Sequence, residues 1–355
     1  MKYHLLLLFL LPLAGFAQIK ITGNVVNAAD GKPVANASVF LSNATVGSKT
    51  TDDGAFVLNY VKPGQYEFVV SVVGFETYRQ IVMAGNENIS LPGIKLSPKT
   101  TSLKEVKIVA SSDWESNYAK FKQEFLGTSV AAEDCKITNN DALTLEYDKE
   151  THRLTGSSTD FLEIENKYLG YKIKYILKTF SKDENTGMLY FDGAALFAAM
   201  DGSLSQKRRW QKRRKQTYEG SSMHFFRSLL QDTTELEGFT VHSMIRKPNP
   251  LWIGESAFAS KYIQTFGKNK LKAVDLLQRT DRDGLYAIAF GDFLHIKHSS
   301  AQRGSVMSIN GPYAYFDTNG IIVNPAMVIF EGVWGRNRMA ELLPVDYEPV
   351  VAADR

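Results

Sequence analysis

The densest group of charged side chains in the sequence is the stretch QKRRWQKRRK, residues 206–215, in which seven basic residues surround one tryptophan. On a helix at about 100° per residue, Gln206, Trp210 and Thr217 fall on one strip and the cations cover the remaining circumference. Such a helix can bury only the tryptophan strip, so the rest must face water. The candidate anion-binding residues are Lys207, Arg208, Arg209, Trp210, Lys212, Arg213, Arg214 and Lys215. A solvated helix face without any ligand is the alternative.

Residues 1–17 have the pattern of a secretory signal peptide. The cellular compartment matters because it determines which anions such a helix can encounter. Lys2 supplies the positive start, residues 5–11 are all apolar, and Gly15 and Ala17 are small residues before the expected cleavage site. We therefore expect export to the periplasm or the outer membrane, with the mature chain starting at Gln18. Export excludes nucleic acid and leaves anionic lipid, acidic polysaccharide or an envelope protein as partners.

Length and composition limit the number of domains and the class of protein. The chain has 355 residues, 44% of them hydrophobic and 22% charged, with a formal net charge of +3. These values are typical of about two globular domains and show that the basic stretch is local. Beyond the signal peptide, no segment reaches the roughly 18–20 apolar residues of a spanning helix, so we expect no transmembrane span.

The histidines and the single cysteine form no recognisable catalytic or metal-binding motif. His295 and His298 form H-x-x-H, but the alternation in DFLHIKH predicts a strand, which sends the two rings to opposite faces. His224 has no partner at metal-ligand spacing, so we expect a hydrogen-bonded structural residue. Cys135 is the only cysteine and is expected to be a small buried hydrophobe.

One pair of carboxylates has a spacing that could serve chemistry. Glu163 and Glu165 lie on one face of a predicted strand, where they could serve acid–base chemistry, but surface carboxylates on strands are far commoner. Neither a nucleophile elbow nor a phosphate-binding glycine pattern occurs in the sequence. We assign no catalytic residue, no metal ligand and no cofactor.

Residues 18–98 consist of short alternating runs separated by turns at Asp30-Gly31, Asp53-Gly54 and Pro63-Gly64. Residues 56, 58 and 60 alternate in one run and residues 66, 68 and 70 in the next, which predicts an antiparallel sandwich of about seven strands. The motifs GNV, DGKPV, ASV, TDDGAF, PGQY and GF follow in order along this stretch. In these motifs it resembles the carboxypeptidase regulatory-like domain, a transthyretin-like sandwich common in exported proteins of Bacteroidota. The resemblance implies a spacer or interaction module and no peptidase zinc site.

Residues 99–111 are expected to be a linker or edge strand. Within them, LKEVKIVA resembles the segment that follows this domain in TonB-dependent receptors, although the remaining chain lacks the alternating segments of a large barrel. Residues 112–345 are expected to form one α+β domain of unknown function with an antiparallel sheet and a few helices, and residues 346–355 a tail. Within that domain, the run MLYFDGAALFAAM is apolar on both faces and predicts a central strand.

The function predicted from these features is a non-enzymatic binding or scaffolding role in the cell envelope, in a chain that is mainly β or α+β. Two alternatives remain open. One is an envelope hydrolase with its site in the second domain. The other is an accessory of a TonB-linked uptake complex, acting through residues 103–110.

Overall fold

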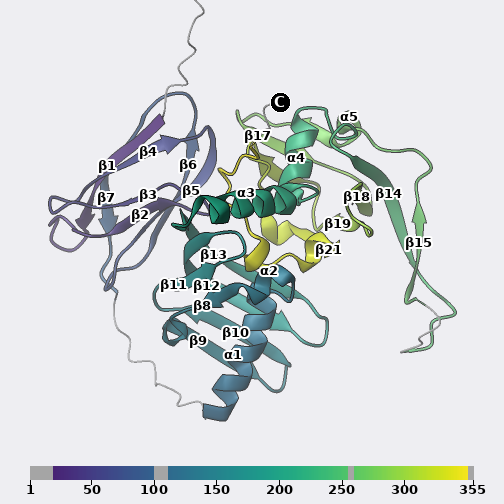
Figure 1. The fold of residues 1–355 in the computed structure, drawn as a ribbon, viewed down its shortest axis with the longest axis horizontal. Coiled ribbons are helices and arrows are strands. Elements are labelled where there is room, and N and C mark those ends of the chain that lie inside the picture. The colour runs from purple at the N-terminus through teal and green to yellow at the C-terminus, as the bar shows by residue number, and fades with distance from the viewer. Residues whose placement is uncertain (1–18, 100–110, 255–259, 351–355) are drawn as a thin grey trace, which may run out of the picture.

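The computed structural model describes residues 19–99, 111–254 and 260–350. The predicted signal peptide and the LKEVKIVA segment lie outside these ranges. The fold class is as predicted, because 44% of residues are in strands and 18% in helices, with several antiparallel sheets. Figure 1 shows the first seven strands set beside a larger body built from the remainder of the chain.

The first part of the chain is a seven-stranded sandwich, as predicted. One sheet has the order β4-β1-β7 and the other β3-β2-β5-β6. All pairs are antiparallel except β1 with β7. Phe56, Phe68 and Val70 are buried between the sheets. The strands are β1 (Ile19–Asn27), β2 (Ser38–Leu41), β3 (Gly47–Lys49), β4 (Ala55–Val61), β5 (Gly64–Ser71), β6 (Tyr78–Ala84) and β7 (Ile89–Leu96).

Tyr60 departs from the predicted alternation in β4. Its φ is +60° and its side chain is exposed, whereas Val61 is buried in its place. The pairing of β1 with β4 shifts register between Ile19 and Ile21, opposite this point. A bulge of this kind places an extra residue in one strand and turns the following side chain to the other face.

The second body contains a six-stranded sheet covered on one face by α1. Its aromatic core includes Phe121 and Phe125 from α1 and Tyr175 and Phe180 from β12. The elements are α1 (Ser111–Leu126), α2 (Val130–Glu133), β8 (Cys135–Ile137), η1 (Asn140–Ala142), β9 (Leu143–Asp148), β10 (Arg153–Ser158), β11 (Leu162–Asn166), β12 (Tyr171–Asp183) and β13 (Leu189–Ala199).

The prediction that the apolar run in β13 is a central strand is wrong. The long central strand is β12, which pairs with β11 and β10 along one side and with β13 along the other. The second face of β13 is apolar for a different reason. Ala194, together with Ile176 of β12, packs against Phe40 and Val69 of the first domain.

A second core lies in the C-terminal half, around a five-stranded sheet of order β15-β14-β18-β19-β21 and a three-stranded sheet of order β16-β17-β20. Phe225, Phe226, Phe316 and Trp334 are among its large buried side chains. The region expected to be one α+β domain therefore holds two hydrophobic cores. The helices are α3 (Leu204–Tyr218), α4 (Ser222–Leu230), α5 (Ala273–Leu276), η2 (Pro325–Met327), η3 (Trp334–Arg336) and η4 (Met339–Glu341). The strands are β14 (Phe239–Pro248), β15 (Tyr262–Phe266), β16 (Leu277–Arg279), β17 (Leu285–Ile288), β18 (Phe293–His298), β19 (Ser305–Ile309), β20 (Ala314–Asp317) and β21 (Val328–Gly332).

The first domain is joined to the body by more than side-chain packing. Asn43 donates its backbone N–H to Ala195 at 2.6 Å, and Phe197 donates to Ala44 at 2.9 Å. The C-terminal segment completes the joint, because Val345 donates to Asn43 at 2.7 Å and Asp346 accepts the hydroxyl of Thr45. Paired backbone groups of this kind hold the two parts in one orientation.

Candidate functional site

Helix α3 begins and ends where its sequence dictates. Ser203 caps the N-terminus in a capping box with Gln206, which satisfies two otherwise unpaired backbone donors. Gly220, with a φ of +79°, separates α3 from α4, which begins at the N-cap Ser221. The predicted sequence of helix, glycine break and helix is therefore confirmed, and α3 crosses in front of the body in Figure 1.

Trp210 fixes α3 to the turn between β11 and β12. The indole is 5% exposed, and its Nε1–H donates to the carbonyl of Lys167 at 3.0 Å. The ring lies flat against Gly170, whose φ is +71° and where an added Cβ would lie 2.2 Å from the indole. Only glycine fits this close approach, so Trp210 is the buried anchor that the helical projection predicted.

Arg213 and Arg214 are half-buried against the body, which corrects the expectation that these two cations face water. Arg214 donates to the carbonyl of Leu169 at 2.7 Å and to that of Gly170 at 2.8 Å, with its guanidinium 3.8 Å from the Tyr171 ring centroid. Burial lowers the pKa of Arg214 from its ordinary value. The carbonyl groups of residues 167–170 all accept hydrogen bonds from side chains of α3, and that of Gly170 also accepts one from the Met200 N–H. Arginine suits this role because its guanidinium is a rigid fork of donors.

Arg213 extends the same contact. Its guanidinium lies 4.1 Å from the centroid of the Tyr168 ring, donates to the Tyr168 carbonyl at 3.3 Å, and lies 3.7 Å from Asp134. Together Trp210, Arg213 and Arg214 form what we call the α3 clamp. The clamp residues support the helix and are not free to hold a ligand.

Four cations of α3 remain exposed: Lys207, Arg208, Arg209 and Lys212. None of them has a carboxylate partner among the residues that the structure describes. The ammonium of Lys215 lies 3.7 Å from a carboxylate oxygen of Glu219, four residues later in the chain. The predicted set of eight therefore divides into a clamp of three, one residue near a carboxylate, and four cations that we call the α3 basic face.

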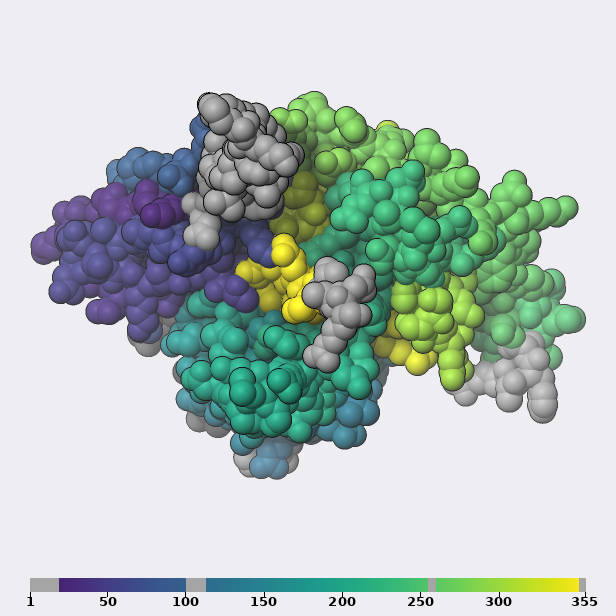
Figure 2. Space-filling model, turned by 45° about the horizontal axis from the view of Figure 1, so that its top comes forward, coloured from purple at the N-terminus to yellow at the C-terminus, as the bar shows by residue number. Residues whose placement is uncertain are grey.

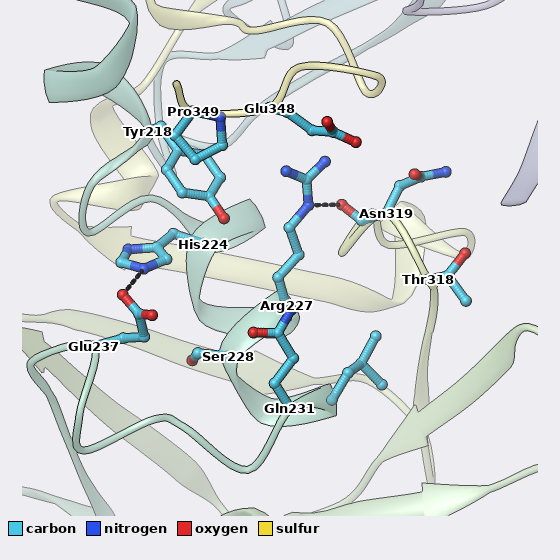
Figure 3. Close-up of a pocket in the computed structure, with 11 residues that line it drawn as sticks. Tyr218, His224, Arg227, Ser228, Gln231, Glu237, Thr318, Asn319, Glu348 and Pro349 are labelled. Carbon is cyan, nitrogen blue, oxygen red and sulfur yellow. Dashed lines mark hydrogen bonds and ion pairs between the residues drawn. The ribbon is translucent and has the colours of Figure 1, made fainter. Parts of the chain in front are cut away.

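A cavity of about 520 Å³ opens beside α4, and sequence reasoning missed most of its lining. Figure 3 shows His224 and Glu237 on one side and Arg227 in the middle, with Glu348 and Pro349 of the C-terminal segment above. These residues come from segments more than 100 positions apart, and no local motif links them. Only His224 was singled out from the sequence.

His224 is hydrogen-bonded at both ring nitrogens, as expected for a structural histidine. Nδ1 lies 3.1 Å from the backbone N–H of Gly220, and Nε2 lies 3.1 Å from Oε2 of Glu237. The Gly220 N–H can only donate, so Nδ1 accepts and the ring proton is assigned to Nε2. Burial lowers the pKa of His224, against the opposing effect of Glu237. The neutral ring has no free lone pair and cannot act as a general base in this arrangement.

Arg227 is likewise occupied by backbone. It donates from Nε to Asn319 at 2.8 Å, from Nη1 to Tyr347 at 2.8 Å and from Nη2 to Val345 at 3.0 Å. Its role is to hold the C-terminal segment onto α4. Glu348 on the cavity rim pairs with Lys62 of the first domain at 2.7 Å. The cavity is thus a polar recess whose charged groups already have partners, and it suits binding better than acid–base chemistry.

The remaining sequence candidates do not converge. His295 lies against the Phe266 ring, whereas His298 Nε2 lies 2.9 Å from the Glu237 carbonyl oxygen, and both are in strand β18 as predicted. Glu163 and Glu165 face Lys174 and Lys172 across the β11–β12 pair.

Cys135 is buried as expected, and burial raises the pKa of its thiol to about 12. Within the described ranges, no group of three or more His, Cys, Asp or Glu residues could hold a metal ion. Over the same ranges, no helix is both long enough and apolar enough to cross a membrane.

Comparison with known proteins bears on the first domain. No curated protein matches the chain. Among solved structures, it is similar to 5-hydroxyisourate hydrolase of Klebsiella pneumoniae, with 15% identity over 23% of this chain and 92% of that one, at a TM-score of 0.20. A cohesin–X-dockerin complex from Acetivibrio cellulolyticus matches with 15% identity over 22% of this chain, at a TM-score of 0.20. The match spans 56% of that cohesin-complex chain, about half its length.

A further similarity covers more of the chain. A putative membrane-associated protein of unknown function from Bacteroides fragilis matches with 10% identity over 84% of this chain and 92% of that one, at a TM-score of 0.18. Residues 21–108 match the family described as the CarboxypepD_reg-like domain, which bears out the resemblance carried by the turn motifs. The N-terminal sandwich of this protein is therefore a carboxypeptidase regulatory-like domain of transthyretin-like fold.

Proposed function

We propose that the protein is a non-catalytic binding protein of the cell envelope, exported to the periplasm or outer membrane, and that its α3 basic face holds anionic groups there. The observation that carries this proposal is that some basic residues of α3 anchor the helix while others remain exposed. Trp210, Arg213 and Arg214 fix the helix, and Lys207, Arg208, Arg209 and Lys212 are left exposed without carboxylate partners in the described chain.

Rigid presentation is what makes this face suited to binding. A flexible lysine-rich loop loses conformational freedom when it binds, whereas cations on an anchored helix lose only side-chain freedom. The whole chain carries only +3, so the attraction is local to α3. Exposed charges act over about 8–10 Å at physiological salt, so binding should weaken steeply as salt is raised.

The chemistry of the ligand follows from what α3 lacks. An interfacial helix needs a broad apolar stripe to enter a bilayer, but the exposed part of α3 offers only Leu204. Contacts at the α3 basic face are therefore electrostatic, with phosphate or carboxylate oxygens as acceptors. Lipid headgroups and acidic polysaccharides both present these groups.

The first domain supports a scaffolding contribution. Its regulatory-like fold is a non-catalytic module in the resemblance drawn above, and it is joined to the body at Asn43, Ala44 and Thr45. The rival hydrolase is not favoured by the cavity beside α4, because both nitrogens of His224 and the guanidinium of Arg227 are committed to internal contacts. The TonB-linked alternative depends on residues outside the described ranges.

Binding of the purified protein to two probes tests the proposal: vesicles containing phosphatidylglycerol, and soluble polygalacturonate. The test variant carries K207Q, R208Q, R209Q and K212Q, which leaves the clamp intact. The control variant carries K20Q, K49Q, K95Q and K99Q, four exposed lysines of the first domain, and so has the same net charge.

We expect the wild type and the control to bind at least one probe in a salt-dependent way. The test variant should bind at least about tenfold more weakly. The probe that is bound identifies the source of the anionic groups. Equal binding by the test and control variants, or no binding of the wild type to either probe, would contradict the proposal.

A further inference from the structure

Strands β14 and β15 form a hairpin that extends beyond the body of the protein. In Figure 1 it runs out along the right-hand side, and in Figure 2 the same green segment projects at the right edge of the surface. Strand β15 is the edge strand of its sheet, and all five of its residues are exposed. Because the side chains on both faces of β15 are exposed, the strand packs on no hydrophobic core and its surface is accessible to a partner.

Three described residues that follow β14 on this hairpin are apolar and exposed. Leu251 is 77% exposed, Ile253 is 87% exposed, and Trp252 between them is 36% exposed. Tyr262 and Ile263, at the start of β15, are also exposed and lie close to this turn, because Asn249 donates its N–H to the carbonyl of Lys261. Three consecutive apolar side chains in solvent are unusual for a monomeric surface and mark an interaction site. We call Leu251, Trp252 and Ile253 the hairpin tip.

The charge around the hairpin tip is mainly positive. Residues 239–272 contain six lysines and arginines but a single carboxylate, Glu255, which lies outside the described residues. Arg246 is neutralised by Glu331 at 2.9 Å. Lys247 and Lys261, which flank the tip, are exposed. The ammonium of Lys261 lies 5.5 Å from the Trp252 ring centroid and 5.6 Å from that of Tyr262.

We propose that the hairpin tip inserts into the surface of an anionic lipid bilayer, with Lys247 and Lys261 at the level of the headgroups. Tryptophan and tyrosine prefer the boundary between acyl chains and headgroups, and lysine extends its ammonium from there to phosphate. The tip presents this combination on a hairpin that projects from the body of the protein (Figure 1). This inference rests on the envelope location in the proposed function, but it uses a surface separate from α3.

Two other occupants fit less well. A second copy of the chain would bring its own Lys247 and Lys261 against these lysines, which is repulsive. A β-strand added along the edge of β15 would be recognised by alternating side chains, whereas the apolar residues of the tip are consecutive and lie in the turn beyond the strand. Charge complementarity therefore favours an anionic lipid surface.

Sedimentation with vesicles tests the inference, comparing phosphatidylcholine alone with phosphatidylcholine that also contains phosphatidylglycerol. The test variant is L251S/W252S/I253S. The control variant is V73S/V130S/L236S, which removes three comparably exposed apolar side chains elsewhere. We expect the wild type and the control to bind the anionic vesicles, with a blue shift of the tryptophan fluorescence that the tip variant, which lacks Trp252, does not show. The tip variant should lose at least about tenfold in partitioning, as removal of buried apolar area predicts.

Equal binding by the tip and control variants overturns the inference. Loss of binding only in the α3 variant described above also overturns the inference, while it supports the proposed function. Loss of binding only in the tip variant supports the inference and contradicts the role proposed for the α3 basic face. Concentration-dependent dimerisation that the tip variant abolishes, without vesicle binding by the wild type, would assign the tip to self-association instead.

Discussion

Replacing Trp210 with alanine should release α3 from the body, and the structure sets the size of the effect. The indole is 5% exposed, packs on Gly170 and donates to the Lys167 carbonyl. Loss of a buried tryptophan costs about 3–5 kcal/mol, and the lower end applies because α3 lies at the surface. A loss of about 3 kcal/mol raises the population of the detached helix by about 100-fold.

Limited tryptic digestion reads this population directly, because α3 carries seven lysines and arginines between residues 207 and 215. When opening and closing are fast relative to cleavage, the cleavage rate follows the open fraction. We expect cleavage within residues 207–215, followed by mass spectrometry, to accelerate about 100-fold in W210A. W210F keeps an aromatic ring, although a smaller one, and loses the hydrogen bond of about 1 kcal/mol, so cleavage should accelerate by at least about fivefold.

A change at an exposed position of the same helix is the control. Gln211 is exposed beside Trp210, so Q211A should alter the cleavage rate by no more than about twofold. Acceleration of less than about tenfold in W210A, or equal acceleration in W210A and Q211A, would refute the view that the clamp holds α3.

Three further predictions concern the contacts around α3 and α4. R227M removes three charge-assisted hydrogen bonds to backbone carbonyls, so hydrogen exchange in residues 344–349 should accelerate at least about tenfold; unchanged exchange would contradict the tether. Burial lowers the pKa of His224 in the folded protein below its ordinary 6.5. The stability that the neutral ring contributes is therefore present above about pH 6.5 and is lost as pH falls through the pKa of the folded state. H224Q should flatten the decline in Tm between about pH 7.5 and 5.5, and an equally steep decline in H224Q would contradict this prediction. A194E places a carboxylate in the packed joint between the domains and should increase the radius of gyration in solution scattering, whereas A198E, at an exposed position of the same strand, should not.

The sequence was most informative where structure is local. Turn pairs such as Asp30-Gly31 and alternation in residues 66–70 predicted the sandwich, because a strand's faces and ends depend on neighbouring residues. In α3 the helical spacing correctly identified Trp210 as buried, but Gln206, expected on the same strip, is exposed and Thr217 is only half-buried. Tyr60 escaped prediction because a bulge depends on the partner strand and leaves no fixed mark in its own sequence.

Contacts between segments that lie far apart in the sequence could not be predicted. The apolar residues of β13 suggested a central strand, since no property of Ala194 indicates whether its partner is another strand or a docked domain. Arg213 and Arg214 looked identical to their exposed neighbours, because only the fold reveals the carbonyl groups of residues 168–170 beneath them. Glu237 and Glu348 both line the cavity, and only tertiary packing brings their segments together.

The central claim is that the α3 basic face holds the protein at the envelope, and fractionation of the source cells tests it most directly. The wild type should sediment with the outer membrane, as should the charge-matched control changed at Lys20, Lys49, Lys95 and Lys99. The variant changed to glutamine at Lys207, Arg208, Arg209 and Lys212 should be released by osmotic shock. If that variant remains with the membrane to the same extent as the control, the α3 basic face is only a solvated surface and the account is wrong.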